Sequence, residues 1–325
     1  MKYKDRVYNE IEIHEPIILD LINCPSLQRL KYIDQAGYLE PFFPGTAQSR
    51  FEHSIGVYYL LKMYNAPLEE QIAGLIHDVS HSIFSHCIDY VLDVGSETDH
   101  SHQDNVFDEF VRNSEIPEII KKHDLDLDYI LDDKNFPLKE KNLPDLCADR
   151  IDYSLRTAIV FKDIENAKYF LDNLIVENKN WIFKNFESAK KFAELFYKLN
   201  TEYFAGLSSA IMFRTVGDCL RFALAKGYIS ENDLYTTDEQ VIQKIKSHLD
   251  QDFDLKLLFD RMNNKTKIEN NPDNYKKKVF CKSRIIDPFC YDHEKIKKVS
   301  ELDSEWKKIL IQESQPKEYF LKFDK

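Results

Sequence analysis

The chain has 325 residues, of which 43% are hydrophobic, and only 8 glycines and 11 prolines, a composition typical of a globular, helix-rich protein with a sizeable core. The formal net charge of −12 disfavours a general nucleic-acid-binding surface, and the lack of any apolar run of about 18 residues excludes a transmembrane helix. Six scattered cysteines without a Cys-x-x-Cys pair, and an N-terminus without the apolar core of a signal peptide, lead us to expect a reduced, cytoplasmic protein.

The first half of the chain is expected to be mainly helical. Apolar residues recur at helical spacing over residues 15–36, and Pro25 divides this stretch into two short helices. A turn is expected at Phe42–Thr46, where proline and glycine follow each other. The remaining helices expected in this half are Ser54–Tyr64, Pro67–Val79 with its proline in the first turn, 102–113 and 144–158.

The second half is expected to mix helices with a few strands. Two apolar triplets, Leu174–Val176 and Trp181–Phe183, flank a polar turn and predict a β-hairpin. A long helical stretch at 187–226 follows, with an interruption near Gly206 or Gly217. The last expected elements are a helix that Asp238 caps and that runs through His248, a polar surface loop at 261–278, and a strand at Lys278–Asp287.

These elements predict a large helical domain over residues 1–230 that includes the small hairpin. Residues 231–325 are expected to form a small C-terminal α+β lobe packed on it. The chain contains neither an internal repeat nor a low-complexity linker, so one compact body with an appendage is the simplest plan.

Histidine is concentrated in one short window that suggests metal binding. The chain has 10 histidines, yet His77, His81 and His86 lie within ten positions, directly after an apolar run. The adjacent His77 and Asp78 can offer an imidazole nitrogen and a carboxylate oxygen to one divalent ion. His53 upstream and Asp149 downstream can complete a set of two nitrogens and two oxygens. Such a set leaves coordination positions open on an octahedral ion such as Mn²⁺ or Fe²⁺, which can then activate water or bind a phosphate oxygen.

Five sequence segments form a pattern in a fixed order along the chain. They are Leu27–Ile33, Phe43–Gly45, Arg50–Val57, the His-Asp window through His86, and Asp149–Tyr153. Together they resemble the HD-domain metal-dependent phosphohydrolases, and more narrowly the branch that contains the human sterile-alpha-motif-and-HD dNTP triphosphohydrolase and its bacterial relatives. The resemblance implies a mainly α-helical HD-domain fold and implies His53, His77, Asp78 and Asp149 as metal ligands.

Four further residues are candidates for acid–base chemistry. His81 and His86 are expected to face the bound phosphate, where an imidazole can hydrogen-bond a phosphoryl oxygen or protonate a leaving oxygen. Asp89 follows His86 by three positions and can orient it. The resemblance implies a role for His102, although Gln103 stands where the relatives usually carry an acid, and His100 is an alternative partner. For each of these histidines the competing interpretation is a structural one.

Four residues are candidates for substrate binding. Arg50, three positions before His53, can clamp a phosphate, and Arg150 lies beside Asp149. The alternative for both arginines is an ordinary salt bridge with one of the many acids. The resemblance implies that Tyr153 lines the sugar pocket and that Gln35 meets the sugar.

The resemblance weakens along residues 195–210. The relatives carry arginines, histidines and a tyrosine on the corresponding helix, which grip the distal phosphates and the sugar. Here Leu199 and Leu207 align with two of those positions, and Lys198 is the only cation in the stretch. A triphosphate carries about four negative charges and needs several cations. This difference therefore argues against the relatives' way of binding a triphosphate, and the sequence does not identify the substrate.

The sequence therefore predicts a metal-dependent nucleotide phosphohydrolase, with dNTP triphosphohydrolysis as the leading reaction. The first alternative is a phosphatase or phosphodiesterase acting on another nucleotide or a nucleic-acid end, and the second is a non-catalytic nucleotide-binding regulator. The net negative charge of the chain disfavours a nuclease or a toxin–antitoxin partner. We expect one divalent metal per site (Mn, Fe, Ni, Zn or Mg), and the resemblance implies a homo-oligomer, either a dimer or a tetramer. We expect no membrane association.

Overall fold

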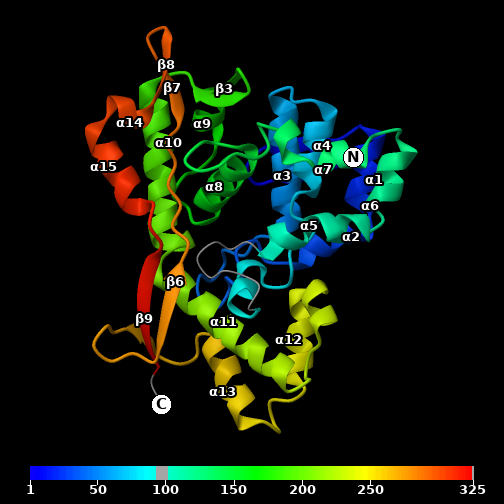
Figure 1. Ribbon diagram of the computed structural model, residues 1–325, viewed down its shortest axis with the longest axis vertical. Coiled ribbons are helices and arrows are strands. Elements are labelled where there is room, and N and C mark those ends of the chain that lie inside the picture. Colours follow the sequence, from blue (N-terminus) through cyan, green and yellow to red (C-terminus); the bar gives the residue numbers. More distant parts are fainter. Residues whose placement is uncertain (93–101, 324–325) are drawn as a thin grey trace.

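The computed structural model describes residues 1–92 and 102–323, and it shows a mainly helical protein with three small sheets (Figure 1). This agrees with the expected fold class. The helices in the first part of the chain are α1 (Pro16–Asn23), α2 (Pro25–Arg29), α3 (Arg50–Met63), α4 (Leu68–Ile76), α5 (His102–Arg112), α6 (Ile116–Lys122), α7 (Leu127–Leu131) and α8 (Ala148–Val160). Those that follow are α9 (Lys168–Asp172), α10 (Phe186–Leu199), α11 (Leu207–Ala225), α12 (Asp238–Lys246), α13 (Phe253–Met262), α14 (Val299–Leu302) and α15 (Ser304–Glu313).

The strands form sheets that join distant parts of the chain. The N-terminal strands β1 (Lys2–Asp5) and β2 (Asn9–Glu12) pair with each other. The expected hairpin, β3 (Leu174–Glu177) and β4 (Asn180–Phe183), continues into β7 (Phe289–Asp292) and β8 (Lys295–Lys298), because β4 pairs in parallel with β7. The third sheet has the order β5 (Ile268–Asn270), β9 (Lys317–Phe323) and β6 (Lys277–Cys281). The expected loop at 261–278 therefore includes the end of α13 and β5, and the expected strand at Lys278–Asp287 ends at Cys281.

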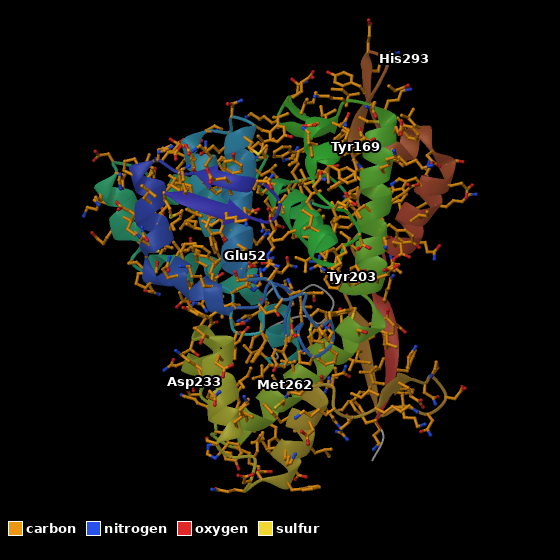
Figure 2. All side chains as sticks on the ribbon, turned by 180° about the vertical axis from the view of Figure 1, so that it is seen from behind. Glu52, Tyr169, Tyr203, Asp233, Met262 and His293 are labelled. Carbon is orange, nitrogen blue, oxygen red and sulfur yellow. The ribbon has the colours of Figure 1, made fainter. Side chains whose placement is uncertain are left out.

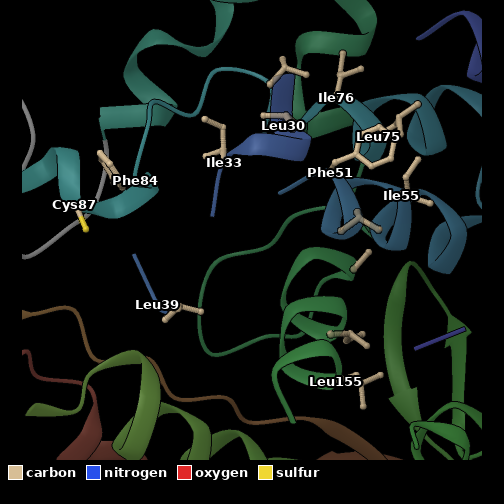
Figure 3. Close-up of a cluster of buried hydrophobic side chains, with 14 of the residues drawn as sticks. Leu30, Ile33, Leu39, Phe51, Ile55, Leu75, Ile76, Phe84, Cys87 and Leu155 are labelled. Atoms are coloured by element: carbon tan, nitrogen blue, oxygen red, sulfur yellow. The ribbon is translucent and has the colours of Figure 1, made fainter. Parts of the chain in front are cut away.

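Helix α3 lies at the centre of the helical body and packs against α4 and α8. It begins four residues before the expected start, because Ser49 and Glu52 form a capping box that satisfies the first backbone amides. Figure 3 shows apolar side chains from these three helices packed together, and all of them are buried. The packed side chains include Phe51 and Ile55 of α3, Leu75 and Ile76 of α4, and Leu155 of α8.

The segment after α4 folds back as a constrained loop. Phe84 and Ser85 have φ values of 51° and 44°, which side chains other than glycine rarely adopt. The Asp238 carboxylate stabilises this conformation, since it accepts hydrogen bonds from the Phe84 amide and the Asp34 amide, both at 2.8 Å. The prediction that Asp238 caps the next helix is wrong, because Thr237 occupies the N-cap of α12. That helix also ends at Lys246, two residues before the expected His248.

The long helical stretch is interrupted at the first of the two expected glycines. Helix α10 ends at Leu199, a single π-helical turn covers Asn200–Phe204, and α11 begins after Gly206 (Figure 1). Figure 2 labels Tyr203 at this break, as seen from behind. Gly217 instead lies inside α11, where a Cβ atom would be 2.7 Å from Tyr90 Cβ and 3.1 Å from the Tyr90 carbonyl oxygen. The glycine therefore allows close packing of α11 on the 3₁₀ helix Ser85–Tyr90.

Residues beyond 230 form both helices and strands, as expected, and they pack on different parts of the helical body. Helix α13 packs against α11, whereas β7 and β8 extend the sheet of the β3–β4 hairpin. The division at residue 230 stays a prediction. Within residues 1–92 and 102–323, every helix is too short or too polar to cross a membrane.

We predict that Gly217→Ala destabilises the protein. Alanine normally stabilises a helix interior by about 1 kcal/mol relative to glycine, but the added methyl group would overlap Tyr90, and overpacking costs about 1–3 kcal/mol. Thermal unfolding should therefore show a lower Tm for the variant. A higher Tm, as helix propensity alone would give, would contradict the close packing described here.

Candidate metal centre and active site

Three predicted ligands converge where α3, α4 and α8 meet. His53 lies in the first turn of α3, His77 is the C-cap of α4, and Asp149 lies in the first turn of α8. The two Nε2 atoms of the histidines are 3.2 Å apart, and Asp149 Oδ1 is 2.9 Å from His53 Nε2 and 3.6 Å from His77 Nε2. These potential ligand atoms all lie within 4.8 Å of one another.

The Asp78 carboxylate lies beside the two histidines of this cluster. Its Oδ1 is 3.4 Å from His77 Nε2, and its Oδ2 is 3.7 Å from His53 Nε2. The side chain is buried, and Arg50 Nη1 donates a 2.6 Å hydrogen bond to Oδ2. The structure thus brings together the four residues predicted as ligands. Two imidazoles and two carboxylates suit a divalent first-row ion.

The electrostatics of the cluster also fit a cation. Burial opposes protonation of His53, but hydrogen bonds to Asp149 and Asp152 raise the pKa of its imidazole to about 9. Burial likewise opposes ionisation of Asp149, yet its hydrogen bonds with His53 and His77 hold the pKa of this carboxyl well below its usual range. The cluster therefore attracts positive charge, which a divalent ion would supply.

A buried network that the sequence did not predict fixes the orientation of His53. Asp152 Oδ2 accepts from His53 Nδ1 at 2.8 Å, which leaves Nε2 directed at the ligand cluster. Arg156 donates to both Asp152 oxygens at 2.9 and 3.0 Å and to Asp5 Oδ2 at 3.0 Å, and Tyr8 Oη donates to Asp152 Oδ1 at 2.9 Å. All five side chains are buried. Asp149, Asp152 and Arg156 are spaced three and four positions apart, so they lie on one face of a helix. This spacing could have indicated from the sequence that the three residues act together.

Gly56 makes room for this network. A Cβ atom at this position would lie 2.0 Å from Asp152 Oδ1 and 2.2 Å from Arg156 Nη2. Because no side chain fits there, α8 can bring its carboxylate against α3 directly behind the ligand His53. The second histidine is oriented by the backbone, since His77 Nδ1 lies 2.7 Å from the carbonyl oxygen of Gly74.

A cavity of about 580 Å³ opens beside the ligand cluster, a size typical of small-molecule sites. Nine of the twelve predicted site residues line it. Three of these are the ligand candidates His77, Asp78 and Asp149. The other six are the predicted acid–base and substrate residues His81, His86, Arg50, Arg150, Tyr153 and Gln35.

His81 and His86 lie together on the cavity wall. Their rings are 5.3 Å apart in an edge-to-face arrangement, and His81 Nε2 is 3.4 Å from Asp78 Oδ1. Burial and the Arg50 charge lower the pKa of both imidazoles well below the usual value, so both are neutral at pH 7. Asp89 Oδ2 is 3.8 Å from His86 Nδ1. The two residues are three apart in a 3₁₀ helix, where such positions are eclipsed.

His102 is not part of the cavity lining among the described residues. Its backbone amide donates to Asp89 Oδ1 at 3.1 Å, and its Nε2 lies 3.2 Å from the hydroxyl oxygen of Tyr235. The neighbouring Gln103 does line the cavity, and its side-chain amide donates to the His77 carbonyl at 2.9 Å. Gln103 therefore helps to hold the end of α4 in place. The alternative residue His100 lies outside the described residues.

The two predicted phosphate-binding arginines also bind protein groups. Arg50 donates to Asp78, to Ser85 Oγ at 2.7 Å and to the Gln35 carbonyl at 2.7 Å. Arg150 donates to the Asp145 carbonyl at 2.6 Å and is 3.2 Å from Glu140. Both guanidinium groups are thus in salt bridges while they line the cavity. Their role in binding phosphate stays a prediction.

Further cavity cations come from segments that the sequence did not single out. Lys139 and Lys141 lie in the loop before α8, and Lys282 and Arg284 follow β6. Lys282 and Arg284 are two positions apart in a segment expected to be a strand, so both were expected on the same face. This spacing could have identified the second pair from the sequence. The C-terminal part of the chain therefore helps to form the candidate active site.

Comparison with known sequences gives a consistent pattern of similarity. Residues 50–157 match the family model described as HD domain. The chain is 36% identical over 250 residues to the uncharacterized protein YdhJ of Bacillus subtilis, an alignment that covers 76% of each protein. It is 34% identical over 173 residues to the metal-dependent phosphohydrolase cns2 of Cordyceps militaris, covering 53% of this chain and 49% of that protein. It is 40% identical over 100 residues to the deoxynucleoside triphosphate triphosphohydrolase SAMHD1 of Homo sapiens, covering 26% of this chain and 16% of that protein.

Two solved structures share the fold across the chain. A hypothetical protein from Aquifex aeolicus superposes with a TM-score of 0.75 at 19% identity, covering 99% of this chain and 96% of that one. A phosphohydrolase from Bacteroides thetaiotaomicron superposes with a TM-score of 0.72, also at 19% identity, over the full length of both chains.

We predict that Asp152→Asn weakens metal binding by about 10–100-fold, the usual effect of losing a carboxylate behind a histidine ligand. Tyr8→Phe removes one hydrogen bond to Asp152 and keeps the charge, so its loss should be only a few-fold. Isothermal titration with Mn²⁺ measures both, with the exposed Asp172→Asn as the matched control. Wild-type affinity in a folded Asp152→Asn protein would contradict the proposed orientation of His53.

We also predict that metal binding strengthens as the pH rises from 6 to 8. The pKa of His53 is about 9 without an ion, so the imidazole is protonated throughout this range, and its Nε2 must lose the proton before it can bind metal. The increase in Tm on adding Mn²⁺ should therefore be larger at pH 8 than at pH 6. An increase independent of pH would show that His53 takes no part in metal binding.

Proposed function

Because the chain belongs to the HD-domain family of metal-dependent phosphohydrolases, we propose that it hydrolyses phosphate bonds of nucleotides, with deoxynucleoside triphosphates as the leading substrate class. One observation carries the proposal. Four buried or half-buried ligand candidates, His53, His77, Asp78 and Asp149, lie close together beside a cavity of about 580 Å³. Several lysine and arginine side chains also line this cavity.

The four ligand candidates would hold one divalent ion. Two imidazoles and two carboxylates accept Mn²⁺, Fe²⁺, Ni²⁺, Zn²⁺ or Mg²⁺. Such an ion supplies Lewis acidity and lowers the pKa of water. Asp152 and the Gly74 carbonyl would keep the Nε2 atoms of the two histidines available to such an ion, and Arg50 holds the Asp78 carboxylate in place.

We propose that His81 and His86 transfer protons near the phosphoryl group. Their neutral imidazoles can hydrogen-bond phosphoryl oxygens, and an anionic substrate would favour their protonated forms. A histidine protonated in this way can donate to the leaving oxygen. Asp89 sits behind His86 and can stabilise that charge.

Hydrolysis of another nucleotide phosphoester is the second candidate. Within residues 195–210, Lys198 is the only cation, and it pairs with Asp163 rather than lining the cavity. Residues 195–210 therefore supply no positive charge to a triphosphate in the cavity, which favours a substrate with a smaller phosphate group. Conversely, Lys139, Lys141, Lys282 and Arg284 favour a larger one. We also propose, from the resemblance alone, that the protein is a homo-oligomer.

We predict that the Mn²⁺-loaded protein hydrolyses at least one member of a panel of ribonucleotides, deoxynucleotides and cyclic nucleotides. Release of tripolyphosphate from a deoxynucleoside triphosphate would support the leading substrate class, and phosphate release alone would support the second candidate. His77→Ala and Asp78→Ala should each lower the rate by more than about 100-fold, because metal catalysis contributes several kcal/mol.

The control for this experiment is His293→Ala, since His293 is 96% exposed at the tip of the β7–β8 hairpin. It should keep wild-type activity. Hydrolysis that is unchanged in both His77→Ala and Asp78→Ala would contradict the proposed site, because it would show that the activity does not depend on these ligand candidates.

A further inference from the structure

Arg284 differs from Arg50, Arg150 and Lys139 of the cavity in having no side-chain partner among the described residues. Among residues 1–92 and 102–323, its guanidinium group makes no hydrogen bond or ion pair, although it is half-buried and lines the cavity. Arg50 pairs with Asp78, Arg150 with Glu140, and Lys139 with Asp133. A half-buried charge without a partner is unfavourable unless a ligand compensates it.

The backbone of Arg284 is held firmly in place. Its amide donates to Asn200 Oδ1 at 2.9 Å, and Asn200 Nδ2 donates to Ser283 Oγ at 3.0 Å. Asn200 is completely buried in the π-helical turn between α10 and α11. Such turns often occur at functional sites. Here the turn uses a buried amide to fix the segment that carries Arg284 beside the cavity.

The charge of Arg284 acts on two different walls of the cavity. Together with burial and Arg50, it lowers the pKa of His86 on the 3₁₀ helix. It also opposes the effect of burial on Tyr153, whose pKa is raised on α8. Arg284, His86 and Tyr153 all line the cavity, so Arg284 shares this space with the histidine wall and the aromatic wall.

We infer that Arg284 binds phosphoryl oxygens of the substrate. The inference rests on the proposed nucleotide phosphohydrolase function, which it deepens by assigning a substrate-recognising residue from the C-terminal part of the chain. A guanidinium group presents a rigid fork of donors that matches two phosphoryl oxygens, whereas a nucleobase or sugar hydroxyl does not need its charge. The fixed backbone lets Arg284 bind the anion without first ordering its own segment.

Binding of inorganic pyrophosphate tests this assignment without requiring turnover. Isothermal titration is carried out on metal-free and on Mn²⁺-loaded protein, for wild type, Arg284→Gln and Arg284→Lys. Arg284→Gln should weaken binding about tenfold or more in both forms, and Arg284→Lys should give an intermediate loss because it keeps the charge but not the fork. Arg112→Gln, an exposed arginine at the end of α5, is the matched control and should bind as wild type.

Two further measurements separate phosphate recognition from a structural role. Because Arg284 has no side-chain partner in the described structure, Arg284→Gln should leave the Tm of the metal-free protein unchanged. With the best nucleotide of the panel, it should raise KM about tenfold and change kcat less than threefold. Binding of the matching nucleoside, which lacks phosphate, should be unaffected.

Undiminished pyrophosphate binding by Arg284→Gln would overturn the inference, as would an equal loss of nucleoside binding. A wild-type protein that fails to bind pyrophosphate in either form would also overturn it. If the wild type hydrolyses no nucleotide at all, the proposed function fails, and the pyrophosphate titration still decides whether Arg284 recognises phosphate.

Discussion

The candidate metal centre depends on one buried carboxylate, Asp152. It joins the ligand His53 to Arg156, and Arg156 in turn binds Asp5 on the N-terminal hairpin. Burying this charge network is favourable only because every member is hydrogen-bonded, and it requires the close approach that Gly56 permits. The same contact between α3 and α8 sets the position of Asp149 against His53. The contact between α3 and α8 therefore determines both the geometry of the site and the packing of the helical body.

The candidate metal ligands could be selected from the sequence because their residue types occur in short, recognisable segments. A His-Asp pair after an apolar run, together with a family pattern across five segments, indicates the donor types without any knowledge of distances. The partners that orient these ligands could not be predicted in this way. Asp5 and Arg156 are 151 positions apart, and Asp238 and Phe84 are 154 apart. Such pairs form only once the tertiary fold is in place, and periodicity carries no signal for them.

The fold was predictable where periodicity or turn chemistry is strong. The two short helices before residue 36, the hairpin at β3–β4 and the break before α11 follow from apolar spacing, proline and glycine. Short elements such as β1 and α7 have too few residues to show a period. The parallel pairing of β4 with β7 joins segments more than a hundred positions apart, so it could not be predicted from local patterns.

We propose that His53, His77, Asp78 and Asp149 bind one divalent ion at the wall of the cavity. Anomalous diffraction from crystals soaked in Mn²⁺, collected near the manganese absorption edge, tests it most directly. We expect one strong anomalous peak per chain, within coordination distance of the Nε2 atoms of both histidines and of both carboxylates. A peak coordinated by other residues, or no peak in crystals that bind Mn²⁺ in solution, would contradict it.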